Sequence, residues 1–222
     1  MVDIIELSAT DLAAMLCSRV CHDLINPVGA IGNGLEVLAD PTQTAMAEGA
    51  QELIANSARH ARAKLEFARL AYGASSTAGT DFDTRECERV ARLLFDIEKA
   101  DLDWQVPLML LPKHKAKLLM NMLLIAAMAV PRGGLVKVGV EGAPGNERFL
   151  LTATSDPEKR QKTLMPSGAE GLLSGRPEEG VDARGIQPFY TGILARMTGM
   201  DLSIAIENDV FVFSAIPMQK AA

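Results

Sequence analysis

A histidine with reactive neighbours lies near the start of the chain, in the run from Cys21 to Pro27 (CHDLINP). Neutral imidazole is a good nucleophile near neutral pH, and a phosphoryl group that it accepts passes readily to a carboxylate. Asp23, the next residue, could orient the ring or take its proton as a general base. Asn26, about one helical turn further on, could hold a water molecule or a phosphoryl oxygen near the reacting centre. The run therefore predicts a phosphate-accepting His22, with Asp23 and Asn26 as further catalytic residues.

A long amphipathic helix must carry this histidine. Ser8 followed by Asp11 resembles a capping box, and the helix that it opens is predicted to run to about Ala39. Pro27 predicts a bend just after the histidine. The apolar residues of the helix recur at spacings of three and four: Leu12, Leu16, Val20, Leu24, Val28, Ile31, Leu35 and Leu38. At about 100° per residue, His22 points roughly opposite this stripe, so we expect an exposed histidine in the middle of a helix.

The helix face around His22 is unusually small and polar. Asn26, Gly29 and Asn33 lie four, seven and eleven residues further on, all within about 40° of the same line. A solvated face would usually carry Lys and Glu, and both are absent from 20–35. An exposed histidine is usually an ordinary surface residue, but the acid, the amide and the proline beside this one favour a function. We therefore predict that another protein docks here, with Arg19, Gly29 and Asn33 among its contacts.

A second helix is predicted to complete a hairpin. Asp40-Pro41 resembles an N-cap and first-turn pair, and Gly73 resembles the glycine that follows a helix. The apolar stripe of this helix consists of Met46, Ala50, Leu53, Ser57, Ala61, Leu65, Ala68 and Tyr72. A hairpin cannot bury such stripes alone, so we expect a homodimer in which two hairpins form a four-helix bundle. The alternative is that the hairpin packs on the rest of its own chain.

Basic residues gather late in the second helix, among them Arg59 and Arg62. They could form a basic rim for the acidic pocket of a docking partner. Equally, they could be placed there because cations are favoured toward a helix C-terminus, with Arg62 pairing with Glu66 one turn on. Both interpretations stay open at this point.

The second half of the chain has a mixed pattern. We predict three regions: a helical hairpin domain (1–73), a linker (74–81) that includes the small and polar run ASSTAGT, and an α/β domain (82–222). The last domain is expected to contain helices near 83–100, 112–130 and 188–198. Strands are expected near 103–110, 135–141 and 149–155, with two more joined at Asn208-Asp209. The predicted fold class is α+β: a helical hairpin that forms a dimeric four-helix bundle, followed by a two-layer α/β sandwich.

The composition of the chain argues against several classes of function. A net charge of −6 argues against a nucleic-acid surface. Three cysteines without a C-x-x-C pair and only three histidines leave little material for a metal site, so we expect no metal. The N-terminus is acidic, and the chain contains no apolar run long enough to span a membrane. We therefore expect the protein to work in the cytoplasm, without a membrane or nucleic-acid partner.

The segment SRVCHDLINPVGAIGNGLEVL resembles the H-box of sensor histidine kinases, a phosphoacceptor pattern of His, acid, two residues, Asn or Thr, and Pro. The stretch 117–134 (KLLMNMLLIAAMAVPRGG) resembles the N-box of the kinases' ATP-binding domain, and 192–199 resembles the helix and turn after their glycine-rich lid. In the kinases a second N-box asparagine holds magnesium. When the two patterns are aligned on Asn121, Ile125 occupies that position here, and it offers no oxygen ligand. The adenine-binding box is reduced to Asp156, and Gln187-Pro188 replaces the lid.

A phosphoacceptor hairpin with a degenerate nucleotide domain is similar to the dimeric histidine phosphotransferases of bacterial cell-cycle phosphorelays. The resemblance implies that His22 carries a phosphoryl group from the receiver domain of a CckA-like hybrid kinase to CtrA-like and CpdR-like response regulators. It implies no ATP and no cofactor in this chain, with magnesium held by the receiver. Two alternatives stay open: an ATP-dependent histidine kinase with a divergent site, and a non-catalytic protein that binds receivers.

Overall fold

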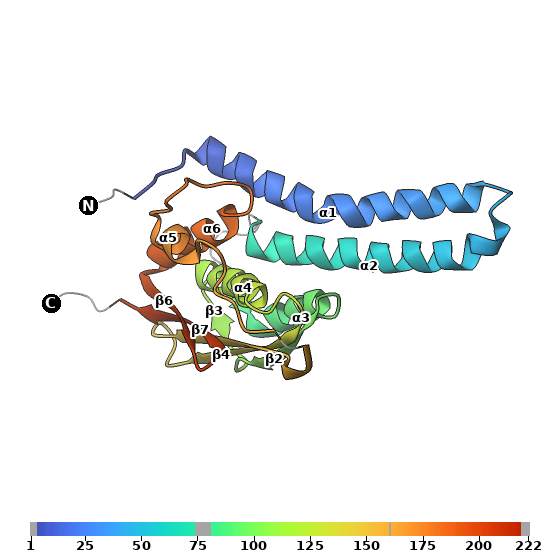
Figure 1. The fold of residues 1–222 in the computed structure, drawn as a ribbon. Helices are drawn as coiled ribbons and strands as arrows, with labels where there is room; N and C mark the ends of the chain where they lie inside the picture. Colours follow the sequence, from blue (N-terminus) through green and yellow to red (C-terminus); the bar gives the residue numbers. More distant parts are fainter. Residues whose placement is uncertain (1–3, 74–80, 160, 219–222) are drawn as a thin grey trace.

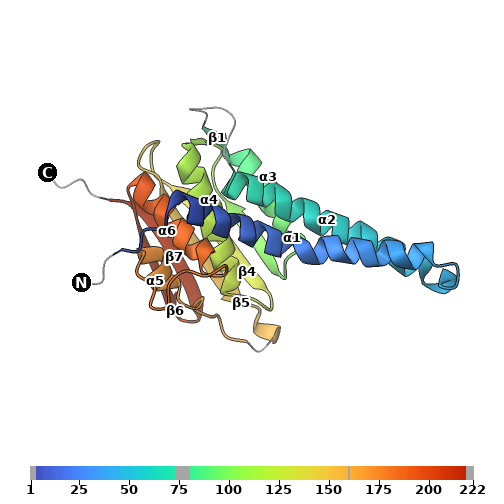
Figure 2. The ribbon, with the colours of Figure 1, turned by 90° about the horizontal axis from the view of Figure 1, so that it is seen from above.

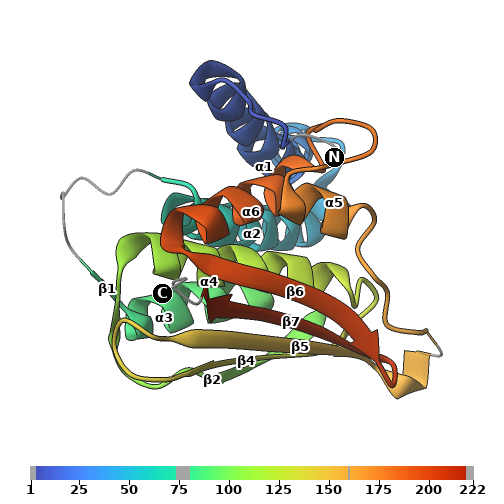
Figure 3. The same ribbon diagram turned by 90° about the vertical axis from the view of Figure 1, so that its left-hand side faces the viewer.

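The computed structural model describes residues 4–73, 81–159 and 161–218. A long helical hairpin lies against an α/β unit, and Figure 3 shows the helices of that unit on one face of its sheet. The helices are α1 (Ala9–Ala39), α2 (Ala47–Ala71), α3 (Thr84–Phe95), α4 (Lys113–Met128), α5 (Ala169–Ser174) and α6 (Ile186–Thr198). The strands are β1 (Phe82–Asp83), β2 (Ala100–Gln105), β3 (Leu110–Leu111), β4 (Gly134–Glu141), β5 (Arg148–Ser155), β6 (Met200–Glu207) and β7 (Val210–Pro217). The predicted α+β class is confirmed.

Helix α1 begins where the sequence predicts. The backbone N–H of Asp11 donates to Ser8 Oγ at 3.1 Å, and the Ser8 hydroxyl donates in turn to Asp11 Oδ2 at 2.7 Å. Ser8 therefore caps the helix, and the Asp11 carboxylate holds the Ser8 hydroxyl in place. Pro27 is buried inside the helix, which changes direction near its middle (Figure 1). A helical proline removes one backbone hydrogen bond, so the predicted bend has a local cause.

The predicted start of the second helix is wrong. Asp40 ends α1 instead, and α2 begins only at Ala47, after a short 3-10 turn over Thr44–Met46. The Asp40 carboxylate accepts hydrogen bonds from the backbone and hydroxyl of Thr42 and from the Gln43 amide, at 2.6–2.9 Å. Aspartate can organise a turn as readily as it can cap a helix, and here Asp40 organises the turn between α1 and α2.

Five strands form the sheet of the α/β unit in the order β2-β4-β5-β7-β6. Only the β2–β4 pair is parallel. The β6–β7 connection is the predicted two-residue turn, with positive φ at Asn208 (50°) and Asp209 (65°). The predicted helix at 83–100 is too long, because α3 ends at Phe95 and the next turn leads into β2 at Ala100 rather than at 103. A short helix, α5, lies in the stretch 156–184 that the sequence left unassigned.

The hairpin is covered by its own chain along part of its length. Leu12 and Leu16 of α1 pack with Phe189 of α6 in one apolar cluster, and Phe67 and Leu70 of α2 join the main core of the α/β unit. The far ends of α1 and α2 project beyond that unit (Figures 1 and 2). The predicted linker lies almost wholly outside the described residues, so its boundaries stay a prediction.

Candidate functional site

His22 lies on the open side of α1, as the periodicity predicts. Its side chain is 69% exposed, although the residue stands in the middle of a 31-residue helix. Its Nδ1 atom lies 3.3 Å from Asp23 Oδ1. An ionised carboxylate only accepts hydrogen bonds, so Nδ1 is the donor in this contact. The lone pair is then on Nε2, which is the nitrogen able to attack phosphorus.

Asp23 is also held from its other side. Arg19 Nε donates to Asp23 Oδ2 at 3.0 Å, across one turn of the helix. The side chains of Arg19 and Asp23 are 20% and 32% exposed, so both are far more sheltered than the imidazole. Sequence reasoning placed Arg19 among the docking contacts and missed its pairing with Asp23. The signal was present, since opposite charges four residues apart on a helix commonly pair.

The remaining residues of the predicted face are exposed. Asn26, Gly29 and Asn33 all lie on the open side of α1, and a Cβ added at Gly29 would meet nothing within 4 Å. The helix surface beside His22 is therefore low and open. Another backbone can approach it closely, as the small side chains predicted.

Arg59 and Arg62 lie together on α2. With His60 they line a hollow of about 360 Å³ whose other wall is formed by Leu93 and the turn after α3. Arg62 also pairs with Glu66 at 3.1 Å, as the second interpretation of the basic residues predicted. Glu66 accepts a further bond from Arg89 of α3 at 2.9 Å. The two interpretations of these arginines are thus compatible, because Arg62 remains 71% exposed while it makes its ion pair.

Part of the α/β unit lies within electrostatic range of the segment around His22, which sequence reasoning did not foresee. The pKa of the Glu98 carboxyl is raised, first by desolvation and further by the Asp23 carboxylate, while Lys64 opposes the shift. Glu98 stands in the turn between α3 and β2. Burial raises the pKa of the Tyr72 hydroxyl, which is also influenced by Arg19 and Asp23. The junction of hairpin and α/β unit is therefore close to Asp23.

Comparison with known proteins decides the family. Residues 84–210 match the model of the histidine phosphotransferase C-terminal domain. The chain is 46% identical over 211 residues to the protein phosphotransferase ChpT of Brucella abortus (strain 2308), covering 95% of this chain and 98% of that one. This chain belongs to the histidine phosphotransferase family. A solved structure of a bacterial phosphotransferase superposes on it with a TM-score of 0.86 at 45% identity, covering 96% of this chain and 98% of the other. The protein is a histidine phosphotransferase of a phosphorelay, acting with receiver domains of response regulators.

In this phosphotransferase the N-box-like asparagine is part of the protein's own hydrogen bonding. The amide nitrogen of Asn121, which is fully buried, donates to the carbonyls of Ala71 and Lys117 at 3.1 and 2.8 Å. Its oxygen accepts from the Gln187 amide at 2.7 Å, and Gln187 accepts from the Tyr72 hydroxyl. This network joins the end of α2 to α4 and α6. Asn121 therefore holds the hairpin on the α/β unit.

The other positions of the degenerate boxes are also structural. Ile125 is fully buried in the main core. Gln187, Pro188 and Phe189 form the first turn of α6, and all three are buried. Phe189 of this turn packs against α1, and Gln187 bonds to Asn121 of α4. The segment that stands where the kinases have their lid is therefore the buried first turn of a helix.

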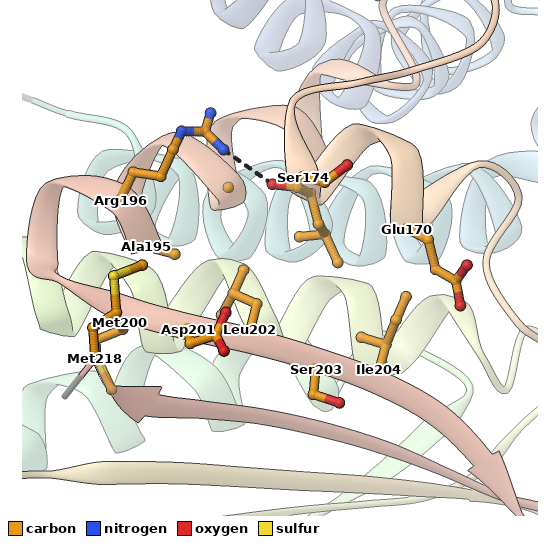
Figure 4. Close-up of a pocket in the computed structure, with 12 residues that line it drawn as sticks. Glu170, Ser174, Ala195, Arg196, Met200, Asp201, Leu202, Ser203, Ile204 and Met218 are labelled. Carbon is orange, nitrogen blue, oxygen red and sulfur yellow. Dashed lines mark hydrogen bonds between the residues drawn. The ribbon is translucent and has the colours of Figure 1, made fainter. Parts of the chain in front are cut away.

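A second hollow, of about 400 Å³, lies away from His22 and contains no histidine. Its walls come from α5, α6 and the edge strand β6, and none of its lining residues belongs to α1 or α2 (Figure 4). Arg196 lines it and donates to the Leu173 carbonyl at 3.1 Å. The face of α1 that carries His22 is instead open to solvent.

The parts of the chain that the structure describes hold no group of three or more His, Cys, Asp or Glu side chains placed to bind a metal ion. Cys17 and Cys21 are exposed on α1, and Cys87 is buried. Among the same described residues, none of the helices combines the length and the apolar character that crossing a membrane requires.

Proposed function

We propose that His22 is the phosphoacceptor of this phosphotransferase. The observation that carries the proposal is the geometry at His22: an exposed imidazole whose Nδ1 lies 3.3 Å from the Asp23 carboxylate, an arrangement that favours the proton on Nδ1 and the lone pair on Nε2. The Nε2 atom attacks the phosphorus of a receiver aspartyl phosphate, the P–O bond to that carboxylate breaks, and an N–P bond forms. The resulting imidazolium keeps its proton on Nδ1, where the Asp23 carboxylate stabilises the charge. Transfer to a second receiver is the reverse reaction.

A direct assay tests this assignment. The protein is mixed with a receiver domain phosphorylated with labelled phosphate, and the label on this chain is examined for phosphohistidine chemistry. The proposal expects acid-labile, base-stable label on the wild type and none on His22→Ala. Equal labelling of His22→Ala would show that another residue accepts the phosphate. Label that withstands acid but not base would show the same.

We propose that the chain works without ATP and without a metal or cofactor of its own. Asn121 has its amide committed to protein partners, and Ile125 is an apolar side chain with no oxygen to offer. The magnesium ion needed for transfer is expected in the acidic pocket of the receiver. Incubation with labelled ATP and magnesium tests this, since label on His22 in the absence of any receiver would favour the histidine-kinase alternative.

The docking surface that we propose runs along the exposed face of α1 from His22 through Asn26 and Gly29 to Asn33, with Arg19 beside it. Arg59 and Arg62 add positive charge at the neighbouring hollow on α2. A receiver carries its acidic pocket at the reacting centre, so cations at the rim would speed its association. Arg59→Gln combined with Arg62→Gln is expected to slow receiver binding about tenfold at low salt and less at high salt. Arg92→Gln is the control, because that exposed arginine makes a similar ion pair on α3.

Measuring receiver binding shows whether Arg59 and Arg62 attract the receiver or only stabilise α2. If the double substitution leaves association unchanged at low ionic strength, the arginines only stabilise α2.

His22→Ala tests the alternative that the protein binds receivers without catalysis. If that alternative holds, the variant keeps both receiver binding and the full biological effect. Loss of the effect with binding retained supports phosphoryl transfer.

We propose that two copies pair through the projecting half of the hairpin. Its apolar side chains are too exposed for a free surface: Ile25 is 67% exposed, Val28 57% and Met46 58%, with Leu35, Leu53 and Leu65 also exposed. A second hairpin would cover them in a four-helix bundle. Val28→Glu with Leu53→Glu should give monomers by light scattering after gel filtration, with unchanged helix content. Dimers that persist in this variant would place the interface elsewhere.

The identity of the partners is also a proposal. The family resemblance favours a CckA-like hybrid kinase as phosphoryl donor, and CtrA-like and CpdR-like response regulators as acceptors, in cell-cycle regulation in the bacterial cytoplasm. Transfer rates to a panel of receivers test this. Faster transfer to an unrelated receiver than to these would contradict the proposed partners.

A further inference from the structure

Arg19 has no role in the chemistry described so far, yet its position is well defined. Its Nε atom donates to Asp23 Oδ2 at 3.0 Å, while Asp23 Oδ1 faces His22 Nδ1 at 3.3 Å. The three side chains therefore form a chain from guanidinium to carboxylate to imidazole along α1. Only the imidazole is largely exposed.

We propose that Arg19 is a positioning residue for phosphoryl transfer, acting through Asp23 on the tautomer and orientation of the His22 ring. The inference rests on the proposed role of His22 as phosphoacceptor. Arg19 itself does not touch the reacting atoms in this arrangement.

Geometry explains why such a residue is needed. Asp23 is adjacent to His22 in sequence, so the two side chains leave the helix about 100° apart and a free carboxylate would have several rotamers available. The 3.3 Å contact is long for a charge-assisted hydrogen bond, which indicates that Asp23 alone holds the ring loosely. An arginine bond to the second oxygen fixes the carboxylate plane and keeps Oδ1 directed at Nδ1. The Nε2 lone pair is then presented to the incoming phosphoryl group.

The sheltered position of Arg19 supports this role over a direct contact with the partner. Its side chain is 20% exposed, compared with 71% for Arg62, which is an arginine free to reach another protein. Arg19 and Asp23 both also act electrostatically on Tyr72, whose hydroxyl bonds to Gln187 of α6. The pair thus lies against the junction between the hairpin and the α/β unit, where the packing restricts its movement.

The experiment compares Arg19→Gln and Arg19→Lys with the wild type in two measurements. In the first, transfer from a phosphorylated receiver is measured at increasing receiver concentration, which separates the saturating rate from the half-saturating concentration. We expect Arg19→Gln to lower the saturating rate about tenfold, because about 1.4 kcal/mol of orientation from a charged hydrogen bond is lost, with half-saturation changed less than twofold. Arg19→Lys should recover most of the rate, since its ammonium can still reach Asp23.

The second measurement uses no activity at all. The ¹⁵N chemical shifts of the His22 ring report which nitrogen carries the proton. We expect the wild type to hold the proton on Nδ1, and Arg19→Gln to show a mixture of the two tautomers. Arg92→Gln, which removes another arginine pair four residues apart, should leave both measurements unchanged.

Three outcomes would overturn the proposal. An Arg19→Gln variant with an unchanged saturating rate and an unchanged tautomer would show that the pair only supports the helix. A higher half-saturating concentration at an unchanged rate would make Arg19 a docking contact. A wild type with no preferred tautomer would remove the premise. Failure of wild-type His22 to accept phosphate would instead contradict the proposed function, and the ring spectra would still report on Arg19.

Discussion

Replacement of Asn121 by leucine tests whether this asparagine is structural. Leucine has nearly the same volume, so it removes the hydrogen bonds without leaving a large cavity. Two buried groups then lose their partners: the Ala71 carbonyl, at 3.1 Å, and the Gln187 amide, at 2.7 Å. The amide nitrogen of Gln187 keeps only a longer contact of 3.4 Å to the backbone carbonyl of residue 121.

Each buried group left without a partner costs about 1–3 kcal/mol. The gain from burying an apolar side chain offsets part of this cost, so we expect the free energy of unfolding to fall by about 3 kcal/mol. For a chain of this size the midpoint of thermal unfolding should fall by about 6–12 °C. Phosphoryl transfer, measured well below that midpoint, should stay within about twofold of the wild type, because Asn121 holds the fold and not the phosphate.

Urea and thermal unfolding at one fixed protein concentration provide the assay, since pairing of two copies would make stability depend on concentration. Asn56→Leu is the control, because Asn56 is exposed on α2 and its loss should change stability by less than about 0.5 kcal/mol. The reasoning is refuted if Asn121→Leu keeps wild-type stability and loses transfer, since Asn121 would then act in the chemistry.

Three further predictions concern stability. Glu147→Gln breaks the buried pair with Lys115, in which Nζ and Oε2 lie 2.5 Å apart, and should cost about 3 kcal/mol at pH 7. Burial alone would raise the pKa of Glu147, but hydrogen bonds, first that from Lys115, lower it below its usual value. The stabilisation is therefore complete only well above the usual glutamate pKa of about 4.3 and is lost as the pH falls through the lowered pKa, so urea unfolding should show the two proteins converging in acid. Gly192→Ala would place a Cβ 2.0 Å from the Leu173 carbonyl and should cost about 2–3 kcal/mol in the same assay; an unchanged midpoint would contradict the close contact of α5 and α6. Gly29→Ala, with open space around it, should stabilise α1 by about 0.5–1 kcal/mol and yet slow transfer, whereas unchanged transfer would place docking elsewhere.

Local signals were enough to predict much of the fold. The Ser8 cap and the Asn208-Asp209 turn depend on neighbouring residues only, and both are found in the structure. Asp40 misled because its type suits both a helix start and a turn, and Thr42 and the next glutamine decided for the turn. Helix α5 is only six residues long, which is too short for a helical period to show in the sequence.

The candidate site also combines features that the local sequence predicts with features that depend on tertiary contacts. The exposure of His22 and its contact with Asp23 follow from adjacent residues and helical spacing. The proximity of Glu98 and the committed amide of Asn121 depend on contacts across distant parts of the chain. No pattern within one helix could reveal them, because they arise only when the hairpin packs on the α/β unit.

The most direct test of the central claim is transfer of labelled phosphate from a phosphorylated receiver to the purified protein, without ATP, in the wild type and in His22→Ala. Mass spectrometry at neutral or basic pH then locates the modified residue. The account predicts phosphohistidine at His22 in the wild type, passed on when a second receiver is added, and no label in His22→Ala. Wild-type protein that remains unlabelled, or label found on any other residue, would contradict it.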